Sequence, residues 1–376
     1  MRIDVIVNRN ARAYRARPSL LARIAAVCAS RATLHTTTTL ADLHHVARTI
    51  VTRGTDLVVI SGGDGSHMAG ITALATALAT AHPAPSAPAA TPPSASQASP
   101  SPHASAAASS APPGPPAPSA PSAPPAPFSP ALPPIALLPG GTVSTVARNW
   151  GISGDPARLL ARLLARYHPS LPPPALIQRP TLHLRALTPT AVETRIGFIF
   201  GTGLVARFFD HYYASGDPGH LAALKIATRI FAGSFLDDPY ARGVLDPLPC
   251  TLDIDGRTLA PGAWSLIVVS VVPDLGLSLR VTHRAAEDHD RPHLVATPLP
   301  SRQLAPRVTR VLRGLPLGGQ GTIDTLVTTA RLRAPHGLPY ILDGERFHAH
   351  DLTVTAGPHL HMPDFLPPRR RPLSLR

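Results

Sequence analysis

The segment Leu57-Val58-Val59-Ile60-Ser61-Gly62-Gly63-Asp64-Gly65-Ser66 joins a fully apolar strand to a glycine-rich turn, and residues 68–80, rich in Ala and Leu, predict a helix after it. Glycine lets the backbone approach a ligand closely, and a helix N-terminus favours an anion such as phosphate. The turn is neither a Walker loop, which needs Gly-Lys-Ser/Thr, nor a dinucleotide fingerprint, which needs three spaced glycines. The alternative is a plain strand-to-helix turn in which Asp64 caps the helix.

A second glycine turn, Leu138-Pro139-Gly140-Gly141-Thr142-Val143-Ser144-Thr145, follows an apolar strand at residues 135–138. Two such turns at the ends of consecutive strands are expected to face one crevice, where open α/β sheets bind ligands. The sequence around them predicts another strand at residues 3–7. It also predicts helices at residues 20–30, 40–53, 141–149 and 156–167. This β-α-β-α order predicts an α/β domain with a parallel sheet covered on both faces.

Strand patterns dominate the sequence after residue 176, and Asp255-Gly256 and Asp343-Gly344 mark turns between them. One helical stretch, residues 205–213 and 221–231, interrupts the strands. We therefore expect a mainly antiparallel β domain to follow the α/β domain, with the active site in the cleft between them. The strands are predicted at residues 181–186, 194–200, 250–254, 264–272, 294–296, 322–330 and 352–355.

An insertion at residues 81–134 consists almost entirely of Ala, Pro and Ser and contains no charged residue. Such a composition cannot bury a core, so we expect disorder with some polyproline character. It is expected to be a tolerated surface insertion, with a protein-docking role as the alternative. The predicted division is an ATP-binding domain at 1–170 that carries this insertion, a β-rich domain at 171–366 and a basic tail at 367–376.

The chain of 376 residues has a net charge of +13, which suits nucleic acid, an anionic membrane or ligands that bear phosphate. No zinc-finger, RNA-binding or basic-zipper pattern supports nucleic acid, so we expect no such partner. The two cysteines, Cys28 and Cys250, have no partners at zinc spacing, which fits a reducing compartment. We see no signal peptide and no apolar run long enough to span a bilayer, so a cytoplasmic location is expected.

Four further segments accompany the two glycine turns in an order that resembles the diacylglycerol kinase catalytic domain family, which sphingosine kinases and bacterial lipid kinases share. They are Val7-Asn8-Arg9-Asn10-Ala11-Arg12, the stretch from Thr37 to Leu43, Gly197-Phe198-Ile199-Phe200-Gly201-Thr202-Gly203, and Leu342-Asp343-Gly344-Glu345. The resemblance covers nearly the whole chain outside the insertion. It implies a two-domain kinase that uses ATP and Mg²⁺ to phosphorylate a lipid hydroxyl, with a diacylglycerol-like acceptor as the default.

The same resemblance assigns roles to individual residues. It implies that the base is either Asp64 or the Asp343/Glu345 pair. We expect Glu345 to be the base and Asp64 to organise Mg²⁺ and the phosphates. It implies a structural Mg²⁺ at Asp290. The expected setting is the inner membrane face, with peripheral membrane contact and a homodimer as one allowed assembly; the basic tail could lean on anionic headgroups. The positions that match nucleotide contacts in the family are Asn8, Thr37, Gly62, Gly63, Asp64, Gly65, Ser66, Gly141 and Thr142.

Three positions depart from the family pattern. Ser66 replaces the usual Thr and keeps the hydroxyl, whereas Ser144 replaces the usual Asn of the second turn. Near Asp290 the family carries paired acids followed by Gly, and here the Gly is missing. The side chains of this region also suggest a transition-metal cluster, but their spacing fits no standard zinc motif, so we expect a solvated polar loop, with a metal cluster as the alternative. They are His283, Glu287, His289, Asp290 and His293. The departures leave open a non-catalytic nucleotide- or lipid-binding protein, and the GGDG turn alone leaves open a soluble acceptor, as in NAD kinases.

Overall fold

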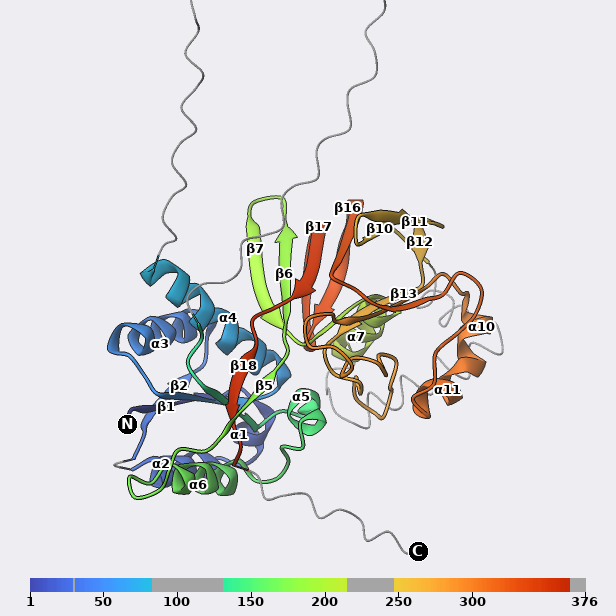
Figure 1. The fold of residues 1–376 in the computed structure, drawn as a ribbon. Helices are drawn as coiled ribbons and strands as arrows, with labels where there is room; N and C mark the ends of the chain where they lie inside the picture. The colour runs from blue at the N-terminus through green and yellow to red at the C-terminus, as the bar shows by residue number, and fades with distance from the viewer. Residues whose placement is uncertain (30, 83–130, 215–246, 366–376) are drawn as a thin grey trace, which may run out of the picture.

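A computed structural model describes residues 1–29, 31–82, 131–214 and 247–365. The bulk of the predicted Ala/Pro/Ser insertion, the second half of the predicted helical stretch at 221–231 and the basic tail lie outside these residues. Figure 1 shows two domains side by side, with the N-terminal domain in blue to green and the C-terminal domain in light green to red. This confirms the predicted fold class.

The N-terminal domain is built on a four-stranded parallel sheet in the order β2-β1-β3-β4. Its inner strands are largely buried and mostly apolar because helices cover both faces (Figure 1). Helices α3 and α4 pack together on one face, and α2 and α6 pack together on the other. The elements are β1 (Ile3–Asn8), α1 (Arg12–Ala16), α2 (Ser19–Cys28), β2 (Thr33–Thr37), α3 (Leu40–Arg53), β3 (Leu57–Gly62), α4 (Asp64–Ala81), β4 (Ile135–Pro139), α5 (Thr145–Asn149) and α6 (Pro156–Arg166).

Side chains at the helix starts explain where α3 and α6 begin. Thr39 accepts a hydrogen bond from the N–H of Asp42, whose carboxylate accepts in return from the N–H of Thr39, which forms a complete capping box before α3. Asp155 caps α6 by accepting from the N–H of Arg158, and Pro156 occupies the first turn, where its missing N–H costs nothing.

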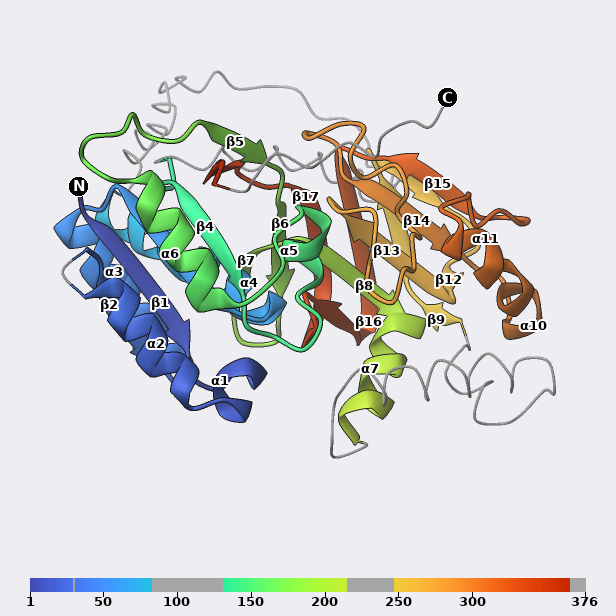
Figure 2. The same ribbon diagram turned by 90° about the horizontal axis from the view of Figure 1, so that it is seen from below.

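The C-terminal domain is a mostly antiparallel sheet in the order β15-β14-β13-β8-β16-β17-β6-β7, and β10 and β11 extend it beside β16. Figure 2 shows its strands side by side from below, with the short helices α10 and α11 at the far edge. The elements are β5 (Leu176–Arg179), β6 (Leu182–Leu187), β7 (Val192–Gly197), β8 (Ile199–Gly203), α7 (Leu204–Ala214), β9 (Leu248–Pro249), β10 (Thr251–Ile254), β11 (Arg257–Leu259), β12 (Ala263–Trp264), β13 (Leu266–Ser270), β14 (His293–Thr297), α10 (Ser301–Leu304), a 3₁₀ turn (Ala305–Arg307), α11 (Val308–Leu312), β15 (Ile323–Leu326), β16 (Thr329–Leu342), β17 (Glu345–Ala356) and β18 (Leu360–Pro363).

The two domains are joined by packing as well as by the chain. Thr72 of α4 exchanges hydrogen bonds with the backbone of Ile196 in β7, at 3.0 Å and 3.3 Å. The antiparallel pair of β5 and β18 crosses back toward the first domain, where β18 contacts β4. A single cluster of buried apolar side chains runs through both domains, so the first domain's turns and the second domain's hairpins hold fixed relative positions.

Several predicted elements differ in extent from those observed. The predicted helix at 141–149 begins only at Thr145, because Ser144 takes a left-handed conformation with φ 51°. The predicted strand at 322–330 is two strands, since β15 ends at Leu326 and β16 begins at Thr329. The sequence did not predict strands β2, β5, β9, β11 and β18 or helices α1, α10 and α11, and it predicted the long hairpin of β16 and β17 only at its turn and its ends. No helix among the described residues is both long enough and apolar enough to cross a membrane.

Candidate active site

The two glycine turns lie against each other, as the sequence predicted. Strands β3 and β4 pair up to Gly62 and Pro139, and the N–H of Gly140 then donates to the carbonyl of Gly62 at 2.7 Å. A Cβ atom on Gly63 would lie 3.2 Å from the Cα of Gly141, so the backbones of the two turns are in contact. Only glycine on both sides allows this approach, which brings two turns to one edge of the sheet.

The first turn is short, because β3 ends at Gly62 and α4 begins at Asp64. Gly63 is the N-cap of α4 and offers no side chain to the helix N–H groups. The N–H groups of Asp64, Gly65 and Ser66 point out of the first helical turn, where an α-helix leaves its donors without internal partners. These residues are half-buried, so an anion can reach donors that the helix dipole makes attractive to it.

The carboxylate of Asp64 joins the two turns. Its oxygens accept hydrogen bonds from the N–H groups of Thr145 at 2.7 Å and Val146 at 3.0 Å, at the start of α5. Asp64 is therefore a capping residue, but for α5 rather than for its own helix. The bonds fix the position of the second turn relative to α4.

The predicted nucleotide contacts from β1 and β2 lie at the same sheet edge. The side-chain amide of Asn8 donates to the hydroxyl of Ser66 at 2.8 Å, which ties the end of β1 to the first turn of α4. Asn8 and Thr37 are partners in the parallel pairing of β1 and β2. Thr37 is buried, whereas Gly141 and Thr142 of the second turn are half-buried. The strand ends thus bring together the predicted nucleotide positions of the first domain.

Asp343 occupies the turn of the β16–β17 hairpin. Asp343 and Gly344 both have positive φ, 51° and 87°, which is the geometry of a two-residue hairpin turn. The carboxylate turns inward and accepts from the N–H groups of Phe198 at 3.0 Å and Ile199 at 2.9 Å. Gly197 makes room for it, since a Cβ there would lie 2.7 Å from an Asp343 oxygen. This carboxylate therefore holds the hairpin onto the β7–β8 junction.

Glu345 reaches from the second domain to the first turn of α4. A Cβ atom on Gly65 would lie 2.7 Å from Cγ and 3.0 Å from Cδ of Glu345. Glu345 is an exposed residue, yet the atoms packed around its carboxylate partly desolvate it and raise its pKa. A carboxylate whose pKa is raised from the usual range becomes a better proton acceptor near neutral pH.

Burial and repulsion act together on Asp343. Its burial, and then the negative charge of Asp64, raise the pKa of Asp343 well above its usual value, although the N–H groups of Ile199 and Phe198 oppose the shift. Glu345 adds a smaller repulsion. Three acidic side chains from two domains thus interact beside a helix N-terminus. Clusters of perturbed acids of this kind are typical of sites that bind a cation or transfer a proton.

The observed contacts of Asp290 do not involve these three carboxylates. Its side chain is 83% exposed, and its carboxylate forms an ion pair with His359 at 3.2 Å. Among the described residues, Asp290 does not belong to a group of three close metal-ligand side chains. A hard cation would find one protein carboxylate and solvent here, fewer oxygen ligands than a structural Mg²⁺ site supplies.

Two cavities lie where the domains meet. One, of about 250 Å³, is lined by α4 and β7, including Thr72, Ala75 and Ile196. The other, of about 390 Å³, is lined by residues such as Leu132, Gln178 and His361. The lining of neither cavity includes the glycine turns, so a ligand held by the turns would lie along the open sheet edge rather than in these cavities.

The sequence analysis missed two buried residues that contact the glycine turns or the strands leading into them. Tyr14 of α1 hydrogen-bonds Ser61 at 2.5 Å, and its ring lies 3.1 Å from the Cβ position of Gly140; burial raises its pKa to about 12. His67 of α4 contacts the carbonyl of Leu138 at 3.1 Å, and complete burial lowers its pKa. The signal for His67 was a lone histidine in the apolar helix pattern three residues after Asp64.

The fold and the site define a two-domain protein that presents paired glycine turns on an α/β domain to acidic side chains from a β domain. The family model described as the diacylglycerol kinase catalytic domain matches residues 2–170, which confirms the predicted resemblance for this part of the chain. A search of curated proteins finds no match to the chain.

Solved structures resemble the chain over nearly its full length. A diacylglycerol kinase from Bacillus anthracis superposes with a TM-score of 0.55 at 12% sequence identity, covering 96% of each chain. A candidate diacylglycerol kinase from the same organism superposes with a TM-score of 0.58 at 14% identity, again covering 96% of each chain. At such low identity the likeness establishes the shared two-domain fold and not a shared substrate.

Proposed function

We propose that this protein is an ATP-dependent lipid kinase that transfers the γ-phosphoryl group of ATP to a lipid hydroxyl. The contact between Gly65 and Glu345 is the observation that carries the proposal. It brings a carboxylate with a raised pKa to the helix N-terminus that suits a phosphate group. A phosphate cradle and a proton acceptor that meet across two domains are what phosphoryl transfer to a hydroxyl requires.

In this proposal the first domain binds the nucleotide phosphates. The N–H groups of Gly65 and Ser66 and the second turn at Gly141 and Thr142 face the same sheet edge, so both turns can donate to phosphate oxygens. Oxygen ligands suit Mg²⁺, which binds through one or two carboxylates together with substrate phosphates, and Asp64 is the carboxylate closest to the turns. Mg²⁺ would neutralise charge on the β- and γ-phosphates.

Glu345 acts as the base in the transfer step. Its carboxylate takes the proton of the acceptor hydroxyl as the hydroxyl oxygen forms a bond to the γ-phosphorus. The bond from the γ-phosphorus to the bridging oxygen breaks, and its electron pair leaves with ADP. Asp343 keeps the hairpin in place through its bonds to Phe198 and Ile199, so it positions Glu345.

Aromatic side chains of α7 beside the hairpin favour a lipid acceptor. Phe209 lies 3.9 Å from the Cβ position of Gly344, and the hydroxyl of Tyr213 donates to the Gly344 carbonyl at 2.5 Å. The rings of Phe208 and Phe209 pack edge to face with centroids 5.7 Å apart. An acyl chain laid along these rings would bring its headgroup hydroxyl toward Glu345.

Peripheral membrane contact, with the inner membrane face as its setting, is part of the proposal. Around α11, Leu312 is 45% exposed and Leu315 is 44% exposed. Exposed arginines flank them at Arg280, Arg310 and Arg313. Leucines can enter the headgroup boundary while arginines meet anionic lipids, so this surface, which we call the α11 surface, fits an anionic bilayer.

The decisive experiment incubates the purified protein with labelled ATP, Mg²⁺ and mixed micelles that contain diacylglycerol, sphingosine or no acceptor, with NAD in a parallel reaction. We expect a labelled lipid, formed fastest with diacylglycerol. The Glu345→Gln variant should lose this activity, whereas Glu287→Gln, which alters an exposed glutamate paired with Arg284, should keep it. Labelled NADP would favour a soluble acceptor, and nucleotide binding without any labelled product would favour a non-catalytic protein.

A further inference from the structure

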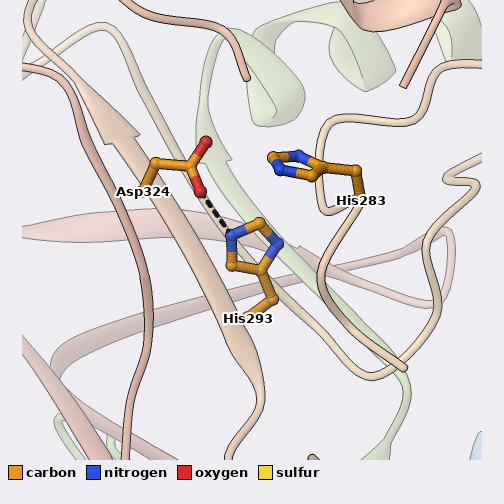
Figure 3. Close-up of side chains that lie close together, drawn as sticks. All are labelled: His283, His293 and Asp324. Carbon is orange, nitrogen blue, oxygen red and sulfur yellow. Dashed lines mark hydrogen bonds and ion pairs between the residues drawn. The ribbon is translucent and has the colours of Figure 1, made fainter. Parts of the chain in front are cut away.

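Two histidines and an aspartate meet at the edge of the second domain's sheet. His293 begins β14, Asp324 lies on the neighbouring strand β15, and His283 comes from the loop that connects β13 to β14. Figure 3 shows the three side chains pointing toward a common centre. One ligand atom from each lies within 4.8 Å of the others, and Nε2 of His293 contacts Oδ1 of Asp324 at 2.7 Å.

Polar atoms of this cluster are left without partners. His293 is completely buried, and the Asp324 side chain is only 18% exposed. Within the described part of the chain, Nδ1 of His283 and Oδ2 of Asp324 are buried and accept or donate no hydrogen bond. A buried polar atom without a partner is costly, so its presence in a native fold requires an explanation. A bound cation would satisfy the carboxylate and use a lone pair of the imidazole.

We propose that His283, His293 and Asp324 form a binding site for a divalent transition metal of the zinc class. Imidazole nitrogen and carboxylate oxygen are common zinc ligands, and three protein ligands with one water complete a tetrahedron. The half-buried positions of His283 and Asp324 leave room for that water. The site shares no residue with the three carboxylates beside α4 or with Asp290, and it does not depend on the proposed kinase activity.

The observed geometry needs a small adjustment to accept the ion. Zinc bonds of about 2.0 to 2.1 Å place neighbouring ligand atoms roughly 3.3 Å apart in a tetrahedron, so His293 and Asp324 must separate slightly and His283 must move inward. The N–H of Arg284 contacts Nδ1 of His293 at 3.3 Å, and binding through Nε2 would put the ring proton on Nδ1 and break this contact. One long hydrogen bond is a small loss beside a metal–imidazole bond.

The metal would act as a clamp on the loop between β13 and β14. The first part of that loop contacts α5, the helix that follows the second glycine turn. There the side chain of Asn149 donates to the carbonyl of Asp274 at 2.8 Å and accepts from its N–H at 3.1 Å. Further along, the loop reaches His283. An ion that joins His283 to β14 and β15 would therefore fasten to the sheet a loop whose other end braces α5.

Cobalt(II) titration of the full-length, metal-stripped protein tests the site, because tetrahedral Co²⁺ with nitrogen and oxygen ligands has visible absorption bands that hexaaquo Co²⁺ lacks. We expect one equivalent to bind with such bands and zinc to displace it. His283→Ala should weaken binding at least about tenfold, because even the loss of an outer partner of a metal ligand costs roughly 10- to 100-fold. This variant should fold, since Nδ1 of His283 has no hydrogen-bond partner among the described residues and the ring otherwise packs edge to face on His293.

A matched control addresses the high histidine content of 18 residues in the chain. His289→Ala removes an exposed histidine of the same loop whose ring packs against the ring of His359, outside the proposed site, so it should leave the cobalt spectrum and affinity unchanged. Asp324→Asn should weaken binding as His283→Ala does. The proposal is overturned if the wild-type protein binds no stoichiometric Co²⁺ or Zn²⁺, or if His283→Ala binds as tightly as His289→Ala.

Discussion

A Cβ atom on Gly65 would lie 2.7 Å from Cγ of Glu345, so glycine at this position lets the Glu345 side chain of the β16–β17 hairpin lie against the first turn of α4. This relationship links the two domains at the proposed reaction centre. A methyl group added at Gly65 would meet the flexible side chain of Glu345. A substitution at Gly65 should therefore affect activity more than stability.

The Gly65→Ala variant is therefore expected to fold and to lose activity. Alanine lowers the entropy of the unfolded chain, which offsets the strain, so the free energy of unfolding should change by no more than about 1 kcal/mol. The displaced Glu345 carboxylate should cost about 100-fold in kcat, the usual effect of misplacing a reacting group by an ångström. Urea denaturation and the labelled-lipid assay measure the two effects. Wild-type kcat in Gly65→Ala would exclude Glu345 as the base.

The Asp64→Asn variant tests the bond between the two turns. The amide of Asn has one acceptor oxygen, which can accept from the N–H of either Thr145 or Val146. Its NH₂ group would then face the remaining N–H, which loses its acceptor. We expect the free energy of unfolding to fall by about 1 to 3 kcal/mol, the usual cost of losing a hydrogen bond to a charged group. The Kd for ATP, measured by calorimetric titration, should rise as the second turn moves, and turnover should be lost because Asp64 also serves Mg²⁺.

Asp155→Asn is the matched control for Asp64→Asn. Asp155 caps α6 on the opposite side of the sheet, and Asn is as good a helix cap as Asp. This variant should lose its ion pairs with Arg17 and Arg23 and little else, so the Kd for ATP should stay at the wild-type value. If both variants left the Kd for ATP unchanged, Asp64 would have no role at the nucleotide.

The raised pKa of Asp343 predicts that the free energy of unfolding depends on pH. Its pKa is raised in the folded protein, so below the unfolded value of 3.8 its contribution to stability is complete, and the contribution is lost as the pH rises through the folded pKa. Asp343→Asn keeps an acceptor for Phe198 and Ile199 and tolerates the positive φ. We expect urea denaturation from pH 4 upward, without Mg²⁺ or nucleotide, to show that the free energy of unfolding of Asp343→Asn rises relative to that of the wild type as the pH rises. A constant difference between the two would contradict the raised pKa.

The sequence predicted those parts of the site that depend on local pattern. Glycine runs after apolar strands located both turns, and Asp343-Gly344 marked the hairpin, because turn chemistry is a property of adjacent residues. The bonds that complete the site join distant residues: Asp64 and Thr145 are 81 positions apart, and Asp343 and Phe198 are 145 apart. Such contacts follow from strand pairing, which periodicity alone does not specify.

The histidine cluster illustrates the same boundary. His283 and His293 stood out in the sequence within one polar loop, together with Glu287, His289 and Asp290. The structure selects the two histidines and adds Asp324, 31 positions after His293, because β14 and β15 pair side by side. The acidic residues of the loop point elsewhere, with Glu287 paired to Arg284 and Asp290 to His359.

Replacing Ser144 with Asn is predicted to increase the affinity for ATP. It holds φ 51° and ψ 54° before α5, and Asn adopts this left-handed conformation far more readily than Ser. The resembling family carries Asn here. We expect Ser144→Asn to lower the Kd for ATP about fivefold, the change that roughly 1 kcal/mol of turn preorganisation corresponds to. Calorimetric titration with ATP checks this; a weaker Kd would mean that the buried position has no room for the larger side chain.

The α11 surface predicts how the protein meets a membrane. Replacing Leu312 and Leu315 with Ser removes apolar side chains that would enter the headgroup region, where full burial of one leucine stabilises by about 1.5 to 3 kcal/mol. Binding to vesicles rich in phosphatidylglycerol should fall at least about tenfold in a sedimentation assay, and so should activity on vesicles, whereas activity on detergent-dispersed lipid should persist. The control is Leu171→Ser with Leu187→Ser, two leucines of equal exposure, 48% and 47%, outside this surface. Equal binding by the two double variants would place membrane contact on another part of the molecule.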